Sequence, residues 1–224
     1  MSKVMLITGA SSGIGEATAR KAAEQNYKLI LTARREKVLQ QMVSEFGDDN
    51  AIAIAADVTD FEALKKVVES GVNKFGRLDV AFANAGAGVS QPGTEQGDVK
   101  EWDDMINLNI NALLYTAKLT LPYLRNSTGH FMMMGSAAGR NTIKGSIYGA
   151  TKWFVHGFAN NLAEEMKEWN GRCTTIAPGM VNTPFFDEPK TDKLDPDDVA
   201  EAVLYAASAN PRNTVREIYL MPSY

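Results

Sequence analysis

Short apolar runs alternate with longer amphipathic stretches along the whole chain, and this alternation limits the fold more than any other feature. The runs typical of β-strands are Lys3–Thr8, Lys28–Ala33, Ala51–Ala55, Asp79–Phe82, His130–Met134, Arg172–Ile176 and Arg216–Leu220. The stretches typical of helices are Gly13–Gln25, Glu36–Phe46, Phe61–Phe75, Glu101–Arg125, Tyr148–Glu168 and Pro196–Ser208. Most of the strand-like runs lack polar alternation, as strands covered on both faces do. The order predicts an α/β protein with a doubly wound parallel sheet of about seven strands and helices on both faces.

The length and the lack of linkers predict one domain. A chain of 224 residues can form one large domain or two small ones. No Pro- or Gly-rich linker and no internal repeat divides it, so we expect a single domain over residues 1–224. Two long irregular stretches, Ala87–Lys100 and Met180–Asp195, each follow a strand. Both should therefore emerge at the carboxyl edge of the sheet, where open α/β folds bind ligands.

Charge and residue counts exclude several classes of protein. The formal net charge is −4, and the sequence has no long run of basic residues. We therefore expect no nucleic-acid partner. A single cysteine, Cys173, and two histidines are too few for an intrachain disulfide, a Cys-rich zinc site or a three-histidine site, so we expect no metal. No apolar run reaches about 18 residues, so we expect no membrane span. The apolar start runs into glycines without a cleavage pattern, which indicates a first strand and a cytoplasmic protein.

A glycine-rich loop, Thr8–Gly15, follows the first expected strand and opens the first expected helix. Glycine permits a tight turn at Gly9, the approach of a phosphate at Gly13 and close packing of helix on strand at Gly15. The helix N-terminus adds free N–H groups and a positive dipole end. A plain glycine-rich turn is the alternative. We expect a dinucleotide pyrophosphate to bind this loop through Gly9, Ser11, Ser12, Gly13, Ile14 and Gly15.

The end of the second expected strand bears on the choice of dinucleotide. Proteins that bind NAD carry an acidic residue about 20 positions after the loop, where it meets the ribose 2′-hydroxyl. Here the strand leads into Arg34 and Arg35, two guanidiniums suited to a 2′-phosphate. Glu36 is a rival, although an acidic residue also suits the first turn of the next helix. We expect NADP (NADPH) rather than NAD; two solvated arginines are the alternative.

Tyr148 and Lys152 stand four residues apart, which places them on one face of a helix. A tyrosine pKa near 10 is too high for proton exchange at pH 7. A neighbouring ammonium favours the phenolate and should lower that pKa, so the pair is a candidate general acid/base. Taken alone, the same spacing also describes an ordinary surface pair.

Further motifs surround this pair in a fixed order along the chain. They are Asp57-Val58, Asn84-Ala85-Gly86, Asn109, Gly135-Ser136-Ala137-Ala138-Gly139 and Pro178-Gly179-Met180-Val181-Asn182-Thr183. From Lys3 to Thr183 the chain resembles the single-domain short-chain dehydrogenase/reductase family, and its last helix and strand look similar too. The resemblance implies a Rossmann-like fold. It also implies an oxidoreductase that interconverts a small carbonyl compound and its alcohol by hydride transfer.

The resemblance implies a role for each motif residue. Tyr148 would act as general acid/base, Lys152 would lower its pKa and hold the nicotinamide ribose, and Ser136 would bind the substrate oxygen. Asn109 would hold a water in a proton relay from the lysine, with Asn111 as a rival for this role. The remaining cofactor contacts would come from Asp57, Val58, Asn84, Ala85, Gly86, Pro178, Gly179, Val181 and Thr183. One departure from the family pattern is Ala83, where a second asparagine is usual.

The stretches beside the expected site are mostly apolar. They offer Val89, Ile143, Ile147, Met180, Phe185 and Phe186. These walls predict a small, mostly uncharged substrate, although Phe185 and Phe186 could equally pack within a lid. The alternative to an enzyme is a non-catalytic NADP-binding regulatory protein on the same fold. Such a regulator should have lost part of the set formed by Asn109, Ser136, Tyr148 and Lys152, which is complete here.

Two aromatic residues, Trp153 and Phe154, fall outside the apolar arc of the helix that follows Tyr148. Large aromatic side chains on a surface indicate that another molecule covers it, while isolated exposed aromatics are the alternative. The family commonly pairs this helix and Glu101–Arg125 across a subunit interface. The resemblance therefore implies a homodimer or homotetramer.

Overall fold

The computed structural model describes residues 2–223 and contains a seven-stranded sheet in the order β3-β2-β1-β4-β5-β6-β7. Every neighbouring pair of strands is parallel. The strands are β1 (Val4–Thr8), β2 (Lys28–Ala33), β3 (Ala51–Ala55), β4 (Val80–Ala83), β5 (His130–Met134), β6 (Arg172–Pro178) and β7 (Glu217–Leu220). This sheet confirms the doubly wound, Rossmann-like α/β fold predicted from the sequence, and the strand ends differ from the predicted ones by at most two residues.

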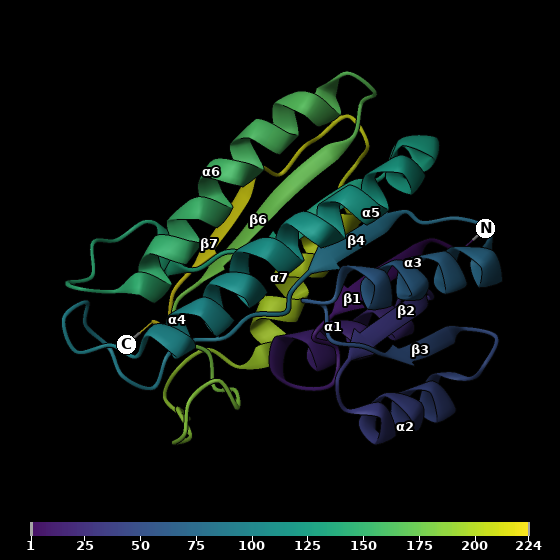
Figure 1. The fold of residues 1–224 in the computed structure, drawn as a ribbon. Coiled ribbons are helices and arrows are strands. Elements are labelled where there is room, and N and C mark those ends of the chain that lie inside the picture. The colour runs from purple at the N-terminus through teal and green to yellow at the C-terminus, as the bar shows by residue number, and fades with distance from the viewer. Residues whose placement is uncertain (1, 224) are drawn as a thin grey trace.

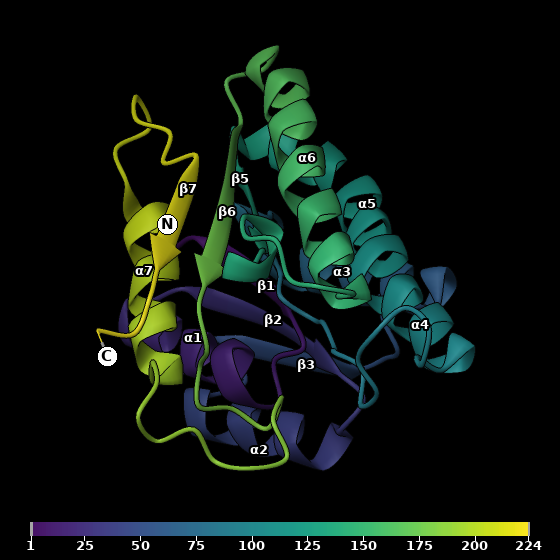
Figure 2. The same ribbon diagram turned by 90° about the vertical axis from the view of Figure 1, so that its left-hand side faces the viewer.

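The described residues form seven α-helices, six of which cover the two faces of the sheet. They are α1 (Gly13–Glu24), α2 (Glu36–Phe46), α3 (Phe61–Phe75), α4 (Val99–Ile106), α5 (Ala112–Ser127), α6 (Ile147–Lys167) and α7 (Pro196–Ser208). Helices α3, α5 and α6 pack on one face, and α1, α2 and α7 pack on the other (Figures 1 and 2). Because both faces are covered, the central strands β1 and β4 are buried along their whole length. None of the described helices is both long and apolar enough to cross a membrane.

The helix predicted at Glu101–Arg125 is wrong in one respect, because the structure divides this stretch into three parts. Helix α4 begins earlier, at Val99, where the Asp98 carboxylate accepts hydrogen bonds from two first-turn N–H groups. A π-helical turn, Asn107–Asn111, then separates α4 from α5. Such a turn inserts an extra residue into a helix and often lies at a functional site. Apolar periodicity does not show the insertion, since the pattern simply resumes on the far side.

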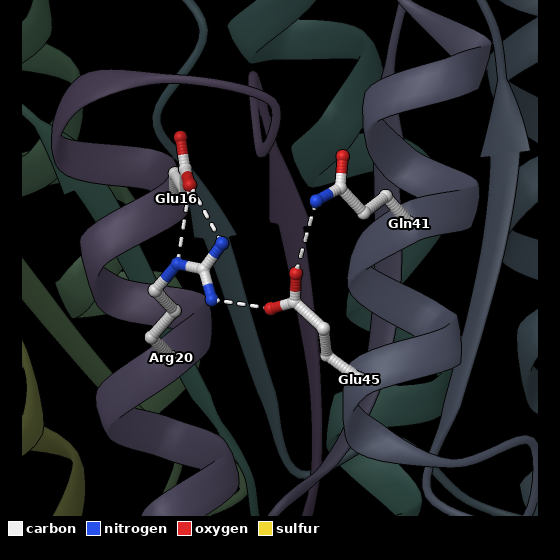
Figure 3. Close-up of polar contacts among 4 residues, drawn as sticks. All are labelled: Glu16, Arg20, Gln41 and Glu45. Atoms are coloured by element: carbon white, nitrogen blue, oxygen red, sulfur yellow. Dashed lines mark hydrogen bonds and ion pairs between the residues drawn. The ribbon is translucent and has the colours of Figure 1, made fainter.

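The two helices that follow β1 and β2 are linked by polar side chains (Figure 3). Arg20 on α1 donates to Glu16 one turn earlier, at 3.1 Å from Nε, and to Glu45 on α2, at 2.5 Å from Nη1. Gln41 also donates to Glu45, at 3.3 Å. Exposed ion pairs of this kind contribute little to stability. The network nevertheless links the helix behind the glycine-rich loop to the helix that follows Arg34 and Arg35.

The strand order reverses direction between β1 and β4, which lie side by side near the middle of the sheet. Open α/β sheets bind ligands outside the carboxyl ends of the strands at such a reversal. The two irregular stretches follow β4 and β6 and reach the same edge, as predicted, and a bridge between Val181 and Leu194 closes the second one at its base. The fold therefore places the glycine-rich loop and both irregular stretches around one opening.

Candidate active site

An open cleft of about 1180 Å³ runs along the carboxyl edge of the sheet. Its lining contains Ser136, Tyr148 and Lys152 together with most of the predicted cofactor residues. These are Gly9, Ser11, Ser12, Gly13, Ile14, Arg34, Arg35, Asp57, Val58, Asn84, Ala85, Gly86, Pro178, Gly179, Val181 and Thr183. Two predicted site residues, Gly15 and Asn109, do not line this cleft. The structure thus gathers segments that are far apart in sequence around one cavity.

The glycine-rich loop turns at Gly9, whose φ of +66° is a backbone conformation that favours glycine. Gly15 is buried beneath the loop, and a methyl group on it would lie 2.3 Å from the carbonyl oxygen of Gly9. Gly15 therefore allows α1 to pack on the end of β1, as the sequence predicts. Helix α1 begins at Gly13, and the Ser12 side chain does not cap it. Its first N–H groups consequently remain available for an anion in the cleft.

A residue that the sequence did not single out for the site, Thr8, fixes the floor of the cleft. Its hydroxyl oxygen at the end of β1 accepts hydrogen bonds from the backbone N–H groups of Asn84, at 3.0 Å, and Ala85, at 3.1 Å. In return, the side-chain amide of Asn84 donates to the Thr8 carbonyl at 2.9 Å. These bonds join the ends of β1 and β4 where the strand order reverses. Asn84 thus holds the cleft together besides lining it.

One end of the cleft is cationic. Arg34 and Arg35 are both exposed there, and Arg35 donates from Nε to the Ser11 hydroxyl at 3.1 Å. Across from them, Asp57 accepts hydrogen bonds from the N–H and hydroxyl of Thr59. The Thr59 N–H lowers the pKa of Asp57 most, and Arg34 lowers it further against the opposing effect of burial. This end presents two guanidiniums, one of them tied to the glycine-rich loop.

The other end of the cleft holds the predicted catalytic residues. Ser136 begins a short 3₁₀ turn, Ala137–Gly139, directly after β5, and its hydroxyl accepts from the Ala138 N–H at 3.1 Å. Tyr148 lies in the first turn of α6, and its hydroxyl interacts with the Ser136 side chain. Lys152 follows one turn later, with its Nζ donating to the Met134 carbonyl at 2.9 Å. The i and i+4 spacing predicted from the sequence therefore places both side chains in the same cleft as Ser136.

The pKa of Tyr148 corrects an expectation from the sequence. Burial raises this pKa, and the hydrogen bond with Ser136 lowers it by less, so the net direction is upward. The Nζ of Lys152 lies 5.7 Å from the centre of the Tyr148 ring. Lys152 is itself almost fully buried, and burial lowers its pKa to about 8. The sequence showed the charge of the lysine, whereas the loss of solvation around both groups depends on the fold.

Asn109 lies behind the cleft, within the π-helical turn. Its Oδ1 accepts from the Ala87 N–H and its Nδ2 donates to the Ala87 carbonyl, both at 2.9 Å. The same Nδ2 donates to the Thr151 hydroxyl on α6 at 3.1 Å. Asn109 and Lys152 also border a small void of about 10 Å³. Asn111, the rival candidate, instead donates to Asn107 within its own turn.

The substrate walls differ in part from the prediction. Ile143, Met180, Phe185 and Phe186 line the cleft, whereas Val89 and Ile147 do not. The Phe185 ring packs against Tyr148 and against Phe186. Met221, which follows β7 and which the sequence does not indicate as a site residue, also lines the cleft. It packs against Gly179, a contact between distant parts of the chain that no local sequence signal reveals.

Comparison with known proteins now places the chain in a family. A model of the short chain dehydrogenase family matches residues 3–194. The chain belongs to the short-chain dehydrogenase family. Among relatives of this short-chain dehydrogenase are uncharacterized oxidoreductases of Staphylococcus aureus, 37% identical, and Staphylococcus saprophyticus, 38% identical. Each match covers 98% of this chain and 97% of the relative.

Solved structures resemble this short-chain dehydrogenase over its whole length. An alcohol dehydrogenase of the archaeon Thermococcus sibiricus, complexed with 5-hydroxy-NADP, has a TM-score of 0.92 at 30% identity and covers 100% of this chain and 98% of its own. The closed form of a serine dehydrogenase complexed with NADP+ has a TM-score of 0.91 at 30% identity, and the match covers 99% of this chain and 96% of the serine dehydrogenase. A 3-ketoacyl-(acyl-carrier-protein) reductase of Brucella melitensis, complexed with NADH, has a TM-score of 0.91 at 27% identity. This match covers 99% of this chain and 97% of the reductase.

Proposed function

We propose that this short-chain dehydrogenase interconverts a small carbonyl compound and its alcohol, using NADP(H) as the hydride carrier. The observation that carries the proposal is the arrangement of the two ends of the cleft. Ser136, Tyr148 and Lys152 meet at one end, and Arg34 and Arg35 stand at the other. The cleft between them has a volume of about 1180 Å³, which is ample for a dinucleotide and a small substrate. We further propose that residues 1–224 act as one oxidoreductase domain in the cytoplasm.

The residues present fit a dinucleotide phosphate. The uncapped start of α1 offers N–H groups to a pyrophosphate, and Gly15 permits the loop to lie close to the helix. Arg34 and Arg35 would hold the 2′-phosphate, and Asp57 and Val58 would line the adenine site. When bound, the nicotinamide supplies or accepts the hydride. Two of the structural neighbours named above carry an NADP compound, and a third carries NADH.

The proton in this reaction would move at the hydroxyl of Tyr148. Because burial raises its pKa, Tyr148 holds its proton at neutral pH and can donate it to a carbonyl oxygen during reduction. Ser136 would hold the same oxygen through its hydroxyl, which already meets Tyr148. The buried Lys152 would favour the phenolate left after donation. The void of about 10 Å³ between Asn109 and Lys152 is close to the size of one water, which supports a relay behind the lysine.

The walls around Tyr148 support a small substrate without charge. Ile143, Met180, Phe185 and Met221 surround this end of the cleft. Among the described residues that line the cleft, the cations other than Lys152 are Arg34 and Arg35, and both belong to the cofactor end. A substrate carboxylate would therefore lose its hydration without gaining a partner.

The decisive test follows NADPH absorbance with a panel of aldehydes, ketones, semialdehydes and alcohols. We expect turnover with an uncharged aldehyde or ketone, loss of turnover in Tyr148→Phe, and unchanged NADPH binding in that variant. Retained activity in Tyr148→Phe would refute the role of the tyrosine. Tight NADPH binding with no turnover of any compound would instead favour the non-catalytic regulator.

The cofactor preference has its own test. Arg34→Ala should weaken NADPH binding far more than NADH binding, because only NADPH carries the 2′-phosphate that the guanidinium would meet. Lys37→Ala provides the control, since it removes an exposed cation that lies outside the cleft lining. Equal losses for both cofactors in Arg34→Ala would refute the 2′-phosphate contact.

We also propose that the protein is a homodimer or homotetramer. Trp153 and Phe154 on α6 are 53% and 37% exposed, and the Phe154 ring stacks on that of Phe158. An apolar surface of this kind favours association with another chain. Light scattering should therefore give a multiple of the 24.4 kDa chain mass. A mass near that of a single chain in dilute solution would contradict the proposal.

A further inference from the structure

Helix α6 carries a third polar side chain in line with Tyr148 and Lys152. His156 stands four residues beyond Lys152 and so lies on the same face of the helix. Its side chain is 15% exposed and reaches the turn that begins at Ser136. A methyl group on Gly135 would lie 2.8 Å from Nε2 of His156, and one on Gly139 would lie 2.7 Å from its Cδ2. The imidazole is therefore packed against both ends of the turn that carries the Ser136 hydroxyl.

The last strand of the sheet supports this imidazole. Glu217 on β7 pairs in register with Thr175 on β6, and its Oε1 lies 3.5 Å from Nδ1 of His156. The same oxygen lies 3.6 Å from Nε of Arg140, which directly follows the 3₁₀ turn. Side chains alternate along a strand, so Tyr219 projects from the same face of β7 as Glu217.

Tyr219 adds two further contacts to this face. The guanidinium of Arg140 lies over the Tyr219 ring, 5.1 Å from its centre. Asn141 donates from Nδ2 to the Tyr219 hydroxyl at 3.4 Å. The residues just after the Ser136 turn are thus tied to β7 from one side, while His156 packs against the turn itself.

Packing alone does not account for the polar character of this contact. Nε2 of His156 and Oε1 of Glu217 are buried, and neither makes a hydrogen bond. Buried polar atoms without hydrogen bonds cost stability, so packing of the core does not by itself explain an imidazole at position 156. Burial lowers the pKa of His156 most, and Arg140 and Lys152 act in the same direction, whereas Glu217 and the Ser136 backbone oppose it. The ring is therefore neutral at pH 7, and a neutral ring avoids placing a further charge beside Lys152.

We propose that His156, which lies beside Glu217, is a positioning residue that fixes the Ser136 turn by packing against it and so directs the Ser136 hydroxyl toward Tyr148. The inference rests on the proposed function, because it concerns a residue behind the proposed proton donor. Ser136 is placed from both sides: Tyr148 meets its hydroxyl in the cleft, and His156 meets its turn from behind. A displacement of about 1 Å at a reacting group can cost about 100-fold in rate. Loss of the imidazole should therefore slow the chemical step without disturbing the distant dinucleotide contacts.

The test compares His156→Leu with the conservative His156→Gln, whose planar amide can pack against Gly135 and Gly139 as the imidazole does. For NADPH-dependent reduction we expect kcat to fall about 10- to 100-fold in His156→Leu. The KM for NADPH should stay within about twofold, since kcat alone reports a loss confined to the chemical step. His156→Gln should recover most of the rate. Hydrogen exchange of residues 135–141, measured without substrate, should be faster in His156→Leu than in the wild type and in His156→Gln.

A second pair of variants covers the case in which His156→Leu does not fold. Glu217→Gln keeps the shape of the carboxylate but removes its charge, and it should lower kcat and loosen residues 135–141 in the same direction. Glu45→Gln on α2 is the matched control, because it removes an exposed carboxylate of an ion pair that lies outside the cleft lining. That control should leave both measurements unchanged.

The two readouts separate this inference from the proposed function. In an active enzyme, a fall in kcat without faster exchange, or faster exchange without a fall in kcat, overturns the positioning role. A wild type that turns over no carbonyl compound refutes the proposed function, and exchange alone then decides whether His156 holds the turn. Equal exchange of residues 135–141 in the wild type, His156→Leu and Glu217→Gln overturns the inference in either case.

Discussion

The Phe185 ring packs against the Tyr148 ring with 5.6 Å between their centres and 57° between their planes. Phe185 comes from the irregular stretch after β6, whereas Tyr148 belongs to the first turn of α6. Across the opening, a methyl group on Gly88 would lie 2.9 Å from Phe185. Phe185 therefore reaches from one irregular stretch to the other above the proposed proton donor.

Phe185→Ala should lower kcat/KM for aldehydes with an apolar group about 10-fold or more, because a pocket contact of this size contributes about 1–3 kcal/mol to recognition. The comparison is a series of aldehydes of increasing chain length. The control is Phe61→Ala, which removes an aromatic side chain that packs on Tyr115, away from the cleft. Equal kcat/KM values for Phe185→Ala and the wild type would show that Phe185 does not contact the substrate.

The lowered pKa of Lys152 predicts an alkaline limit to the reduction reaction. In the folded enzyme Lys152 has a pKa of about 8. Its ammonium group is therefore protonated at lower pH and loses its proton as the pH rises through that value. Since kcat/KM reports the free enzyme, its pH profile should decline near pH 8. Lys152→Arg, whose guanidinium stays charged, should retain some activity and lack this decline. A decline at the same pH in that variant would assign it to another group.

Two glycine-to-alanine variants should have opposite effects on stability. In Gly15→Ala the new methyl group meets the Gly9 carbonyl, so we expect a loss of about 1–3 kcal/mol and weaker NADPH binding. Gly157 lies within α6 with nothing within 4 Å of an added methyl group. Gly157→Ala should therefore stabilise the protein by about 0.5–1 kcal/mol and leave binding intact. Urea denaturation and NADPH titration measure both effects, and equal stabilities would contradict the packing of α1 on β1.

The buried His130 predicts loss of stability in acid. Burial lowers its folded pKa to about 3, whereas an unfolded histidine has a pKa near 6.5. The unfolded chain therefore takes up the proton first, and the free energy of unfolding should fall by up to about 1.4 kcal/mol per pH unit between pH 6.5 and 3. His130→Gln keeps a donor for Thr174, which His130 contacts at 2.6 Å, but does not titrate in this range. Its stability should change less between pH 7 and 4.5, and equal slopes would contradict the assignment.

The sequence predicts the strands well because their environment is simple. A strand such as β2 is buried along nearly its whole length, so its apolar run and the strand coincide at Lys28–Ala33. The site motifs are equally local, since each lies at the end of one strand or within one turn of a helix. The i and i+4 spacing of Tyr148 and Lys152 fixes their common face in advance.

What the sequence does not reveal depends on solvation or on contacts between distant segments. The rise in the Tyr148 pKa reflects burial by the surrounding fold, which no spacing rule contains. The π-helical turn is stabilised by contacts of Asn109 with Ala87 and Thr151, far from it in the chain. The contact between His156 and Glu217 likewise exists only because β7 returns to the edge of the sheet beside β6.

The hydrogen bonds of Thr8 with Asn84 and Ala85 have a wider consequence. They immobilise the base of the cleft through backbone groups, whereas the irregular stretches after β4 and β6 supply the surface around its opening. Substrate recognition by the two irregular stretches is therefore structurally separate from proton transfer at the base of the cleft. Replacing those two stretches with those of a relative should change the substrate preference to that of the relative, while Ser136, Tyr148 and Lys152 keep their positions.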